Sequence, residues 1–291
     1  MICSQITINE AAMSTVPGKV ATIRWFMIGL ISVLALISVL LAPAIGQNPA
    51  YHQFVDQRHL LGITNFWNVI SNAPFVFVGL LGLHECWRQT SGGKMPHVVM
   101  YELPAITVIF FVGVLLTGLG SAYYHLDPNN HTLIWDRLPM TISFMAFFAL
   151  IIGCHVSYRT ARIAAIPLLL AGVGSVLYWN YTESVGAGDL RPYALVQFLP
   201  IFLIPALVLG SGAEAMRSLA VFKIIALYML AKALEQGDAL VFQGLWSEMS
   251  GHAIKHVVAS AAAFIVLLEI RDSRQGLEHE LYLEAKPSKV I

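Results

Sequence analysis

The chain has 291 residues, of which 57% are hydrophobic and 12% are charged, and its mean hydropathy is +0.70. A soluble domain carries about 25% charged residues, so this chain has too little polar material to coat a globule. The 17 Lys and Arg balance the 17 Asp and Glu, which excludes the basic surface that nucleic-acid binding requires. The composition predicts an all-α fold, a polytopic transmembrane helical bundle.

Apolar stretches long enough to cross a membrane follow one another along the chain, since a span needs about 20 residues. We expect spans at residues 22–44, 65–85, 104–125, 138–156, 161–180, 193–211, 218–235 and 252–270. Residues 1–48 then form an N-terminal segment with one extra helix, residues 49–270 a seven-helix core, and residues 271–291 a polar cytoplasmic tail. The triplet Ala-Pro-Ala at residues 42–44 leaves open a second interpretation of the first span, a cleaved signal peptide.

The basic residues and the tryptophans indicate how the helices lie in the membrane. Twelve of the 17 Lys and Arg belong to one set of helix ends, and cytoplasmic ends carry the excess of positive charge. If the first span is retained, both termini are therefore cytoplasmic. The 6 tryptophans all lie near predicted helix ends, which is typical of indole rings in the headgroup region.

Two pairs of polar residues with a spacing of four lie at the ends of predicted spans. Ser121 and His125 end the third span, and His252 and His256 begin the eighth. This spacing places both members of a pair on one helix face. Because the third span runs outward, the eighth runs inward and Asp136 precedes the fourth, we expect all five side chains at the extracytoplasmic end. Polar groups inside a membrane are costly and mark functional sites.

These residue types point to metal-dependent hydrolysis. Three imidazoles with an open fourth position are typical of catalytic zinc, so we predict one Zn²⁺ bound by His125, His252 and His256. Asp136 would hold the attacking water and shuttle its proton, and Ser121 would donate a hydrogen bond to the oxyanion. The alternatives are an interfacial role for His125, haem binding or a proton path for the paired histidines, a salt bridge to Arg137 or a helix cap for Asp136, and bonding of Ser121 to its own helix.

Further polar residues occur on the same predicted side of the membrane. Glu235 and Asp238, near the end of the seventh span, are candidate partners for the ring of a ligating histidine. Glu183, Asp189 and Arg191 fall in an outer loop. We consider this loop a candidate for binding a polar headgroup, and a solvated loop is the alternative.

The motifs together resemble the alkaline ceramidase family. The resemblance rests on Ser121-Ala-Tyr-Tyr-His125, on Asp136 eleven residues later, and on His252-Ala-Ile-Lys-His256. It covers roughly residues 50–270, and the wider superfamily includes adiponectin/progestin-type receptors and haemolysin III-like proteins. It implies a seven-helix bundle around zinc that hydrolyses the amide of ceramide to sphingosine and a fatty acid. By motif position it implies the same ligands and the same roles for Asp136 and Ser121.

One departure from that family concerns calcium. The stretch from Asn65 to Asn72 is similar to the start of the family's first core helix. In members with a calcium site, a glutamate directly precedes Phe-Trp-Asn, where this chain has Asn65, and the only nearby acid is Asp56. Calcium favours six to eight oxygen ligands, so we do not expect Ca²⁺ here. We interpret Asn65 and Asn68 as residues that bond across helices.

The residues and the resemblance favour an integral-membrane, zinc-dependent amidohydrolase whose partner is a membrane lipid substrate. We predict no nucleic-acid partner and no protein partner. A seven-helix, zinc-containing receptor or sensor with little turnover is the alternative. A metal or proton transporter would need polar residues at mid-membrane, and the inner halves of these spans nearly lack them. The lipid itself stays open, since an acylated amino acid would serve the same chemistry as ceramide.

Overall fold

The regular structure of the chain is helical throughout the part that the computed structural model describes, residues 18–91, 98–209, 211 and 216–284, with side chains through residue 271. The elements are α2 (Gly18–Leu41), the 3₁₀ helix η1 (Pro49–His52), α3 (Phe66–Ile70), α4 (Ala73–Ser91), α5 (Val98–Glu102), α6 (Pro104–Leu126), α7 (Asn130–His155), α8 (Tyr158–Ser184), α9 (Arg191–Val208), α10 (Ser218–Gln236), α11 (Asp238–Gly244) and α12 (Gly251–Glu284). The predicted all-α polytopic bundle is confirmed.

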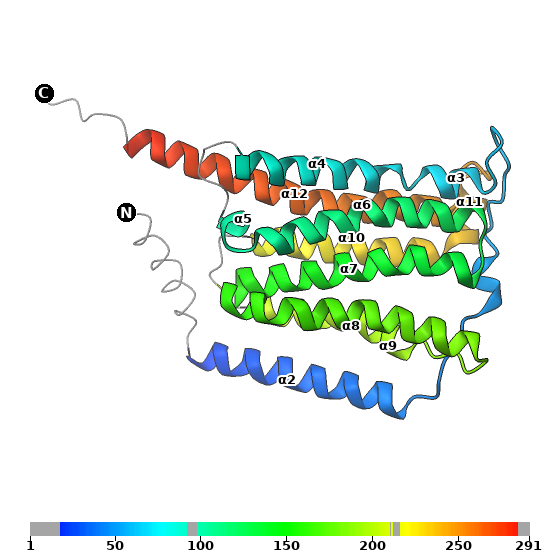
Figure 1. Cartoon of the computed structure of the whole chain (residues 1–291), viewed down its shortest axis with the longest axis horizontal. Helices are drawn as coiled ribbons and strands as arrows, with labels where there is room; N and C mark the ends of the chain where they lie inside the picture. Colours follow the sequence, from blue (N-terminus) through cyan, green and yellow to red (C-terminus); the bar gives the residue numbers. More distant parts are fainter. Residues whose placement is uncertain (1–17, 92–97, 210, 212–215, 285–291) are drawn as a thin grey trace, which may run out of the picture.

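Seven helices among these residues are long and apolar enough to cross a membrane: α2, α3 with α4, α6, α7, α8, α9 and the first part of α12. The other predicted span, α10, runs alongside them (Figure 1) but carries Lys223, Lys232 and Glu235. Lys232 and Glu235 line an internal cavity. These two charged side chains of α10 therefore face the interior of the bundle.

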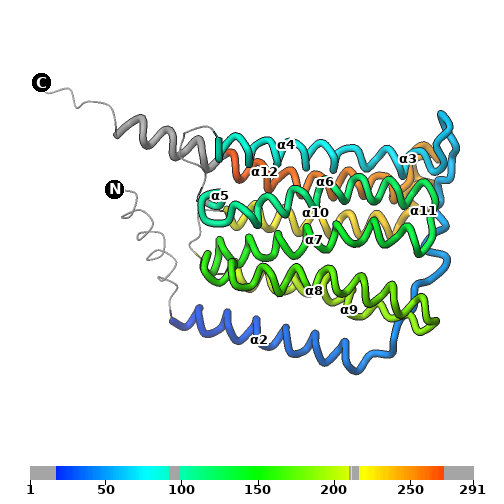
Figure 2. Tube along the Cα trace, viewed as in Figure 1, coloured from blue at the N-terminus to red at the C-terminus, as the bar shows by residue number. Residues whose placement is uncertain are grey.

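The long helices lie side by side, as Figures 1 and 2 show. Contacts close a ring through α4, α6, α7, α9, α10 and α12, while α8 packs on α7 and α9. Helix α2 packs mainly on α9, at the edge of the bundle. Its side chains remain largely exposed, with Phe26 at 68% and Leu40 at 69%, which suits a helix that faces lipid.

Three sequence expectations need correction. Helix α7 begins at Asn130 rather than 138, because Asn129 and Thr132 form a capping box, so Asp136 lies inside this helix. Helix α12 continues to Glu284, so most of the predicted tail is helical, and its cytoplasmic location stays a prediction. Trp179 is fully buried, so its indole lies in the bundle and not in the headgroup region.

The segment between α2 and α3 crosses one end of the bundle (Figure 1). The amide of Leu190 donates to the carbonyl of Ile45, and the amide of Gln47 donates to the carboxylate of Glu183. Further along, the Phe54 ring is buried. This segment therefore covers the end of the bundle at which α6 ends and α7 and α12 begin.

Candidate active site

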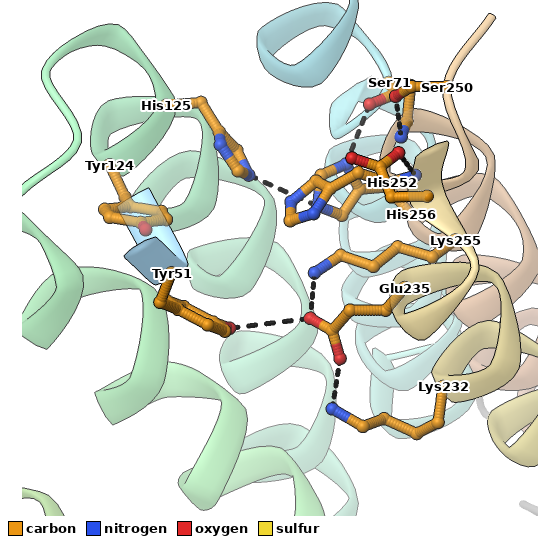
Figure 3. A network of polar contacts seen from close by, with 12 residues as sticks. Tyr51, Ser71, Tyr124, His125, Lys232, Glu235, Ser250, His252, Lys255 and His256 are labelled. Atoms are coloured by element: carbon orange, nitrogen blue, oxygen red, sulfur yellow. Dashed lines mark hydrogen bonds and ion pairs between the residues drawn. The ribbon is translucent and has the colours of Figure 1, made fainter. Parts of the chain in front are cut away.

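Three imidazoles meet at the covered end of the bundle (Figure 3). His125 comes from the last turn of α6, and His252 and His256 come from the start of α12. Their exposed fractions are 1%, 6% and 5%, and their ring centroids lie 5.0 to 5.2 Å apart. One ligand atom from each lies within 4.8 Å of the others. Residues 127 positions apart in the sequence thus form one buried group that could hold a metal ion.

The donor set fits a single zinc ion. The Nε2 atoms of His125 and His256 are 3.3 Å apart, close to the separation that tetrahedral zinc with Zn–N bonds of about 2.0–2.1 Å imposes. His252 Nε2 is buried and has no hydrogen-bond partner in the described part of the chain. Buried ring nitrogens are rarely left unpaired. A divalent ion at the centre of the group would satisfy a nitrogen that protein atoms do not.

Neighbouring side chains fix the orientation of the imidazoles. Ser71 Oγ lies 2.8 Å from His256 Nδ1, which leaves the Nε2 of that ring directed toward His125. Asn65 donates from Nδ2 to the His125 carbonyl over 2.9 Å. The Phe54 ring packs against His125 and His252, with centroid distances of 4.6 and 4.7 Å. The rings are therefore held before any ligand binds.

Two glycines permit the close helix approaches that form the site. A Cβ atom at Gly120 would lie 1.9 Å from the Trp135 carbonyl oxygen, so α6 and α7 approach here as closely as backbones allow. The next residues on these helices, Ser121 and Asp136, both line the same internal cavity. A Cβ at Gly251 would lie 2.4 Å from the Leu234 carbonyl oxygen, which brings the start of α12 against α10.

A cavity of about 490 Å³ extends from this group into the bundle. Ser121, Asp136 and His256 line one part of it. Much of the remaining wall is apolar and includes Phe110, Val114, Phe144, Phe147, Ile201, Ile204, Ile224, Ile225, Ala262, Ala263 and Val266. A polar end that contains the imidazoles and an apolar body suit a lipid whose polar group is placed at the site.

A charged network lies beside the imidazoles (Figure 3). Glu235 pairs with Lys255, at 2.5 Å, and with Lys232. The Tyr51 hydroxyl lies 3.5 Å from the same carboxylate. Among the described residues, Glu235 thus contacts two lysines and a tyrosine and no histidine ring, while Asp238 accepts a hydrogen bond from the backbone amide of His252 over 2.7 Å. The expected contact of these acids with a ring nitrogen is not what the structure shows.

The outer-loop candidates lie apart from the cavity wall. Asp189 and Arg191 form an ion pair at 2.8 Å, and the Arg191 side chain lowers the pKa of Asp189 to about 2 by hydrogen bonding. Arg191 also donates to the carbonyls of Val39 and Ala42. The loop therefore ties the end of α2 to α9, and binding of a headgroup there stays a prediction.

The Asp56 carboxylate, the only acid near Asn65 in the sequence, is engaged by an arginine. Its Oδ1 accepts from Arg58 Nε over 2.9 Å, and its Oδ2 accepts from Arg58 Nη2 over 2.6 Å. Its backbone carbonyl accepts from Asn68 Nδ2 over 3.0 Å. Asn65 and Asn68 both bond to carbonyls outside their own helix, as expected for residues that join segments.

Sequence reasoning missed several side chains of the site. The sequence alone gives no site role to Ser71, which lies within the Asn65–Asn72 stretch, or to Arg137, Lys232 and Lys255. Their signal in the sequence was a charge or hydroxyl within an apolar stretch. Such a signal indicates a polar interior, but it does not identify the residue that each side chain contacts.

Comparisons with known proteins agree with this geometry. The sequence model of the Ceramidase family matches residues 56–281, a range that includes the imidazoles, Asp136 and nearly all the cavity wall. No curated protein matches the chain. Because the match extends over well more than half of the residues, this chain belongs to the ceramidase family.

Proposed function

We propose that the chain is a zinc-dependent amidohydrolase that cleaves the N-acyl amide of ceramide or of a related N-acyl lipid. Membership in the ceramidase family and the membrane-spanning bundle support a membrane hydrolase of the ceramidase type. The observation that carries the zinc and the lipid is the position of His256, which belongs to the buried imidazole group and also lines the cavity. A metal site and a lipid-sized space therefore meet at one side chain.

The residues of the chain divide the chemistry between them. Zinc bound by the three imidazoles would supply a Lewis acid and lower the pKa of a bound water. Asp136 takes the proton of the attacking water and delivers it to the departing amine. Ser121 lines the same part of the cavity as Asp136 and is the candidate donor of a hydrogen bond to the oxyanion.

The experiment combines metal analysis with a substrate panel. The protein is purified in detergent, its zinc content is measured, and fatty acid release is followed with ceramide and other N-acyl lipids. His252→Ala should lose both zinc and turnover. Asp136→Ala should keep zinc and lose turnover by about 10²–10⁴-fold, the usual contribution of a general acid–base residue.

The matched control is His84→Ala, because His84 is an exposed histidine on α4 outside the imidazole group. This variant should keep both zinc and turnover. Stoichiometric zinc without turnover on any lipid of the panel would contradict the hydrolase and favour a sensor. Turnover that survives in His252→Ala would contradict the metal centre.

A further inference from the structure

A buried arginine lies in the wall of the cavity, directly after Asp136. Arg137 is 4% exposed and lines the cavity. Its guanidinium lies over three aromatic rings, those of Trp179 at 4.3 Å, Tyr193 at 4.7 Å and Tyr51 at 5.5 Å. The inference drawn from it rests on the proposed function and concerns the headgroup of the substrate.

Arg137 has no carboxylate within ion-pair distance among the residues that the structure describes. Its Nη2 donates to Gln47 Oε1 over 2.7 Å, and its Nη1 is buried without a hydrogen-bond partner among the described residues. By contrast, Arg58 and Arg191 each pair with an acid. A buried cation is costly unless it is paired, and aromatic rings compensate only in part. This guanidinium therefore retains capacity for an anion.

The other charges of the cavity wall add to the positive potential. Lys232 and Lys255 share the single carboxylate of Glu235. The charged wall residues are thus three cations and two carboxylates, the second of which is Asp136. Because Asp136 carries the proton in the proposed reaction, it is not the permanent partner of a cation. A neutral headgroup would leave this excess of positive charge unmatched.

We propose that the preferred substrate carries a carboxylate beside its amide, as an N-acyl amino acid does, and that Arg137 binds this carboxylate. A guanidinium matches the two oxygens of a carboxylate with a planar pair of donors. Hydrolysis breaks the amide C–N bond; water supplies a hydroxyl to the acyl carbon and a proton to the nitrogen. The products are a fatty acid and a free amino acid.

The test uses two substrates that differ only in the group in question. N-palmitoylglycine and N-palmitoylethanolamine share the acyl chain and the amide, and a carboxylate in the first replaces a hydroxymethyl group in the second. The wild-type chain should favour the glycine conjugate in kcat/KM on the order of ten-fold, as expected for a hydrogen bond to a charged group. Arg137→Gln should remove most of this preference, chiefly through a higher KM for the glycine conjugate.

A binding measurement makes the result independent of turnover. Both compounds are titrated into the zinc-loaded chain in an Asp136→Ala background, which removes turnover, while tryptophan fluorescence is recorded, since Trp179 lies over the guanidinium. Arg137→Gln should weaken binding of the glycine conjugate by roughly ten-fold and leave the affinity for the ethanolamide nearly unchanged. Arg137→Lys keeps the charge and loses the planar pair of donors, so its affinity for the glycine conjugate should lie between those of the wild type and Arg137→Gln. Lys223→Gln is the matched control, because this exposed lysine of α10 lies outside the cavity wall.

Equal kcat/KM for the two substrates, or a ratio that survives in Arg137→Gln, would overturn the inference. Palmitate is a further arm, because the fatty acid product also carries a carboxylate. If Arg137→Gln relieves inhibition by palmitate and leaves the substrate ratio unchanged, the guanidinium serves the product and the inference is wrong. If the chain cleaves ceramide or the ethanolamide and does not prefer the glycine conjugate, this inference is wrong and the proposed function stands. A zinc-loaded chain that cleaves neither ceramide, nor N-palmitoylethanolamine, nor N-palmitoylglycine overturns the proposed function instead.

Discussion

Ser71 decides which nitrogen of one imidazole is available to a metal. Its hydroxyl lies 2.8 Å from His256 Nδ1, and such contacts hold a ligating ring in one tautomer and one orientation. Ser71→Ala should therefore weaken zinc affinity by about 10–100-fold, measured by competition with a chelator of known affinity. Ser260→Ala is the control, because the hydroxyl of this buried serine of α12 donates to the Val257 carbonyl and to no other group in the described part of the chain. Equal zinc affinity in Ser71→Ala and the wild type would contradict this role.

The same contact shows where sequence reasoning ends at this scale. The spacing of His252 and His256 predicted that the two rings share a helix face, because that follows from helix geometry alone. The contacts of Ser71 and Arg137 depend on which helices become neighbours, and a single sequence does not give that. Trp179 was placed at a membrane interface by its position in a span, yet its ring packs under a guanidinium.

At the level of elements, the approach of α6 to α7 depends on a glycine. A Cβ at Gly120 would lie 1.9 Å from the Trp135 carbonyl oxygen, so Gly120→Ala must separate the two helices beside Ser121 and Asp136. We expect a loss of about 1–3 kcal/mol in stability, typical of overpacking, together with a large loss of turnover. Thermal unfolding and fatty acid release measure the two effects.

The control for this prediction lies on α8. A Cβ at Gly174 meets no atom within 4 Å, so Gly174→Ala should keep activity and should stabilise the helix slightly. A Gly120→Ala variant as stable and as active as Gly174→Ala would show that the helices can separate without harm.

The ion pair in the loop between α8 and α9 gives a prediction with a pH dependence. Hydrogen bonds from Arg191 lower the pKa of Asp189 to about 2 in the folded chain, from an ordinary 3.8. A lowered carboxyl pKa contributes stability that is complete above the ordinary value and disappears as the pH falls toward 2. Asp189→Asn should therefore cost about 1–2 kcal/mol, with allowance for solvent screening, and this cost should be constant between pH 5 and 9. A cost that changes across that range, in thermal unfolding at several pH values, would contradict this assignment.

The helices were largely predictable as elements, and the two exceptions have separate causes. Length and apolar composition located the spans, since lipid imposes both. The signal fails in part at α10, where Lys232 and Glu235 face an interior cavity, and it misplaces the start of α7, which the cap at Asn129 determines. Composition describes the lipid-facing surface and carries less information about a polar interior.

For the whole molecule, the imidazole group acts as a link between distant parts of the chain. His125 ends α6 and His252 begins α12, so a shared metal ion joins two helices that are otherwise separated by four long helices in the sequence. An ion that binds only the folded state stabilises it by about 2.7 kcal/mol when its concentration is 100 times the Kd. Removal of zinc by a chelator should therefore lower the Tm of the wild-type chain by roughly 5–10 °C.

The test of this metal-dependent link compares a variant that lacks one of the three imidazoles with a variant that keeps them all. His252→Ala should begin at the lower Tm and should not respond to the chelator, because it has no complete site to empty. His84→Ala keeps all three imidazoles and should respond as the wild type does, and added zinc should restore its Tm. A chelator that lowers the Tm of His252→Ala as much as that of the wild type would act at another site, and the imidazole group would then not be the metal-dependent link between α6 and α12.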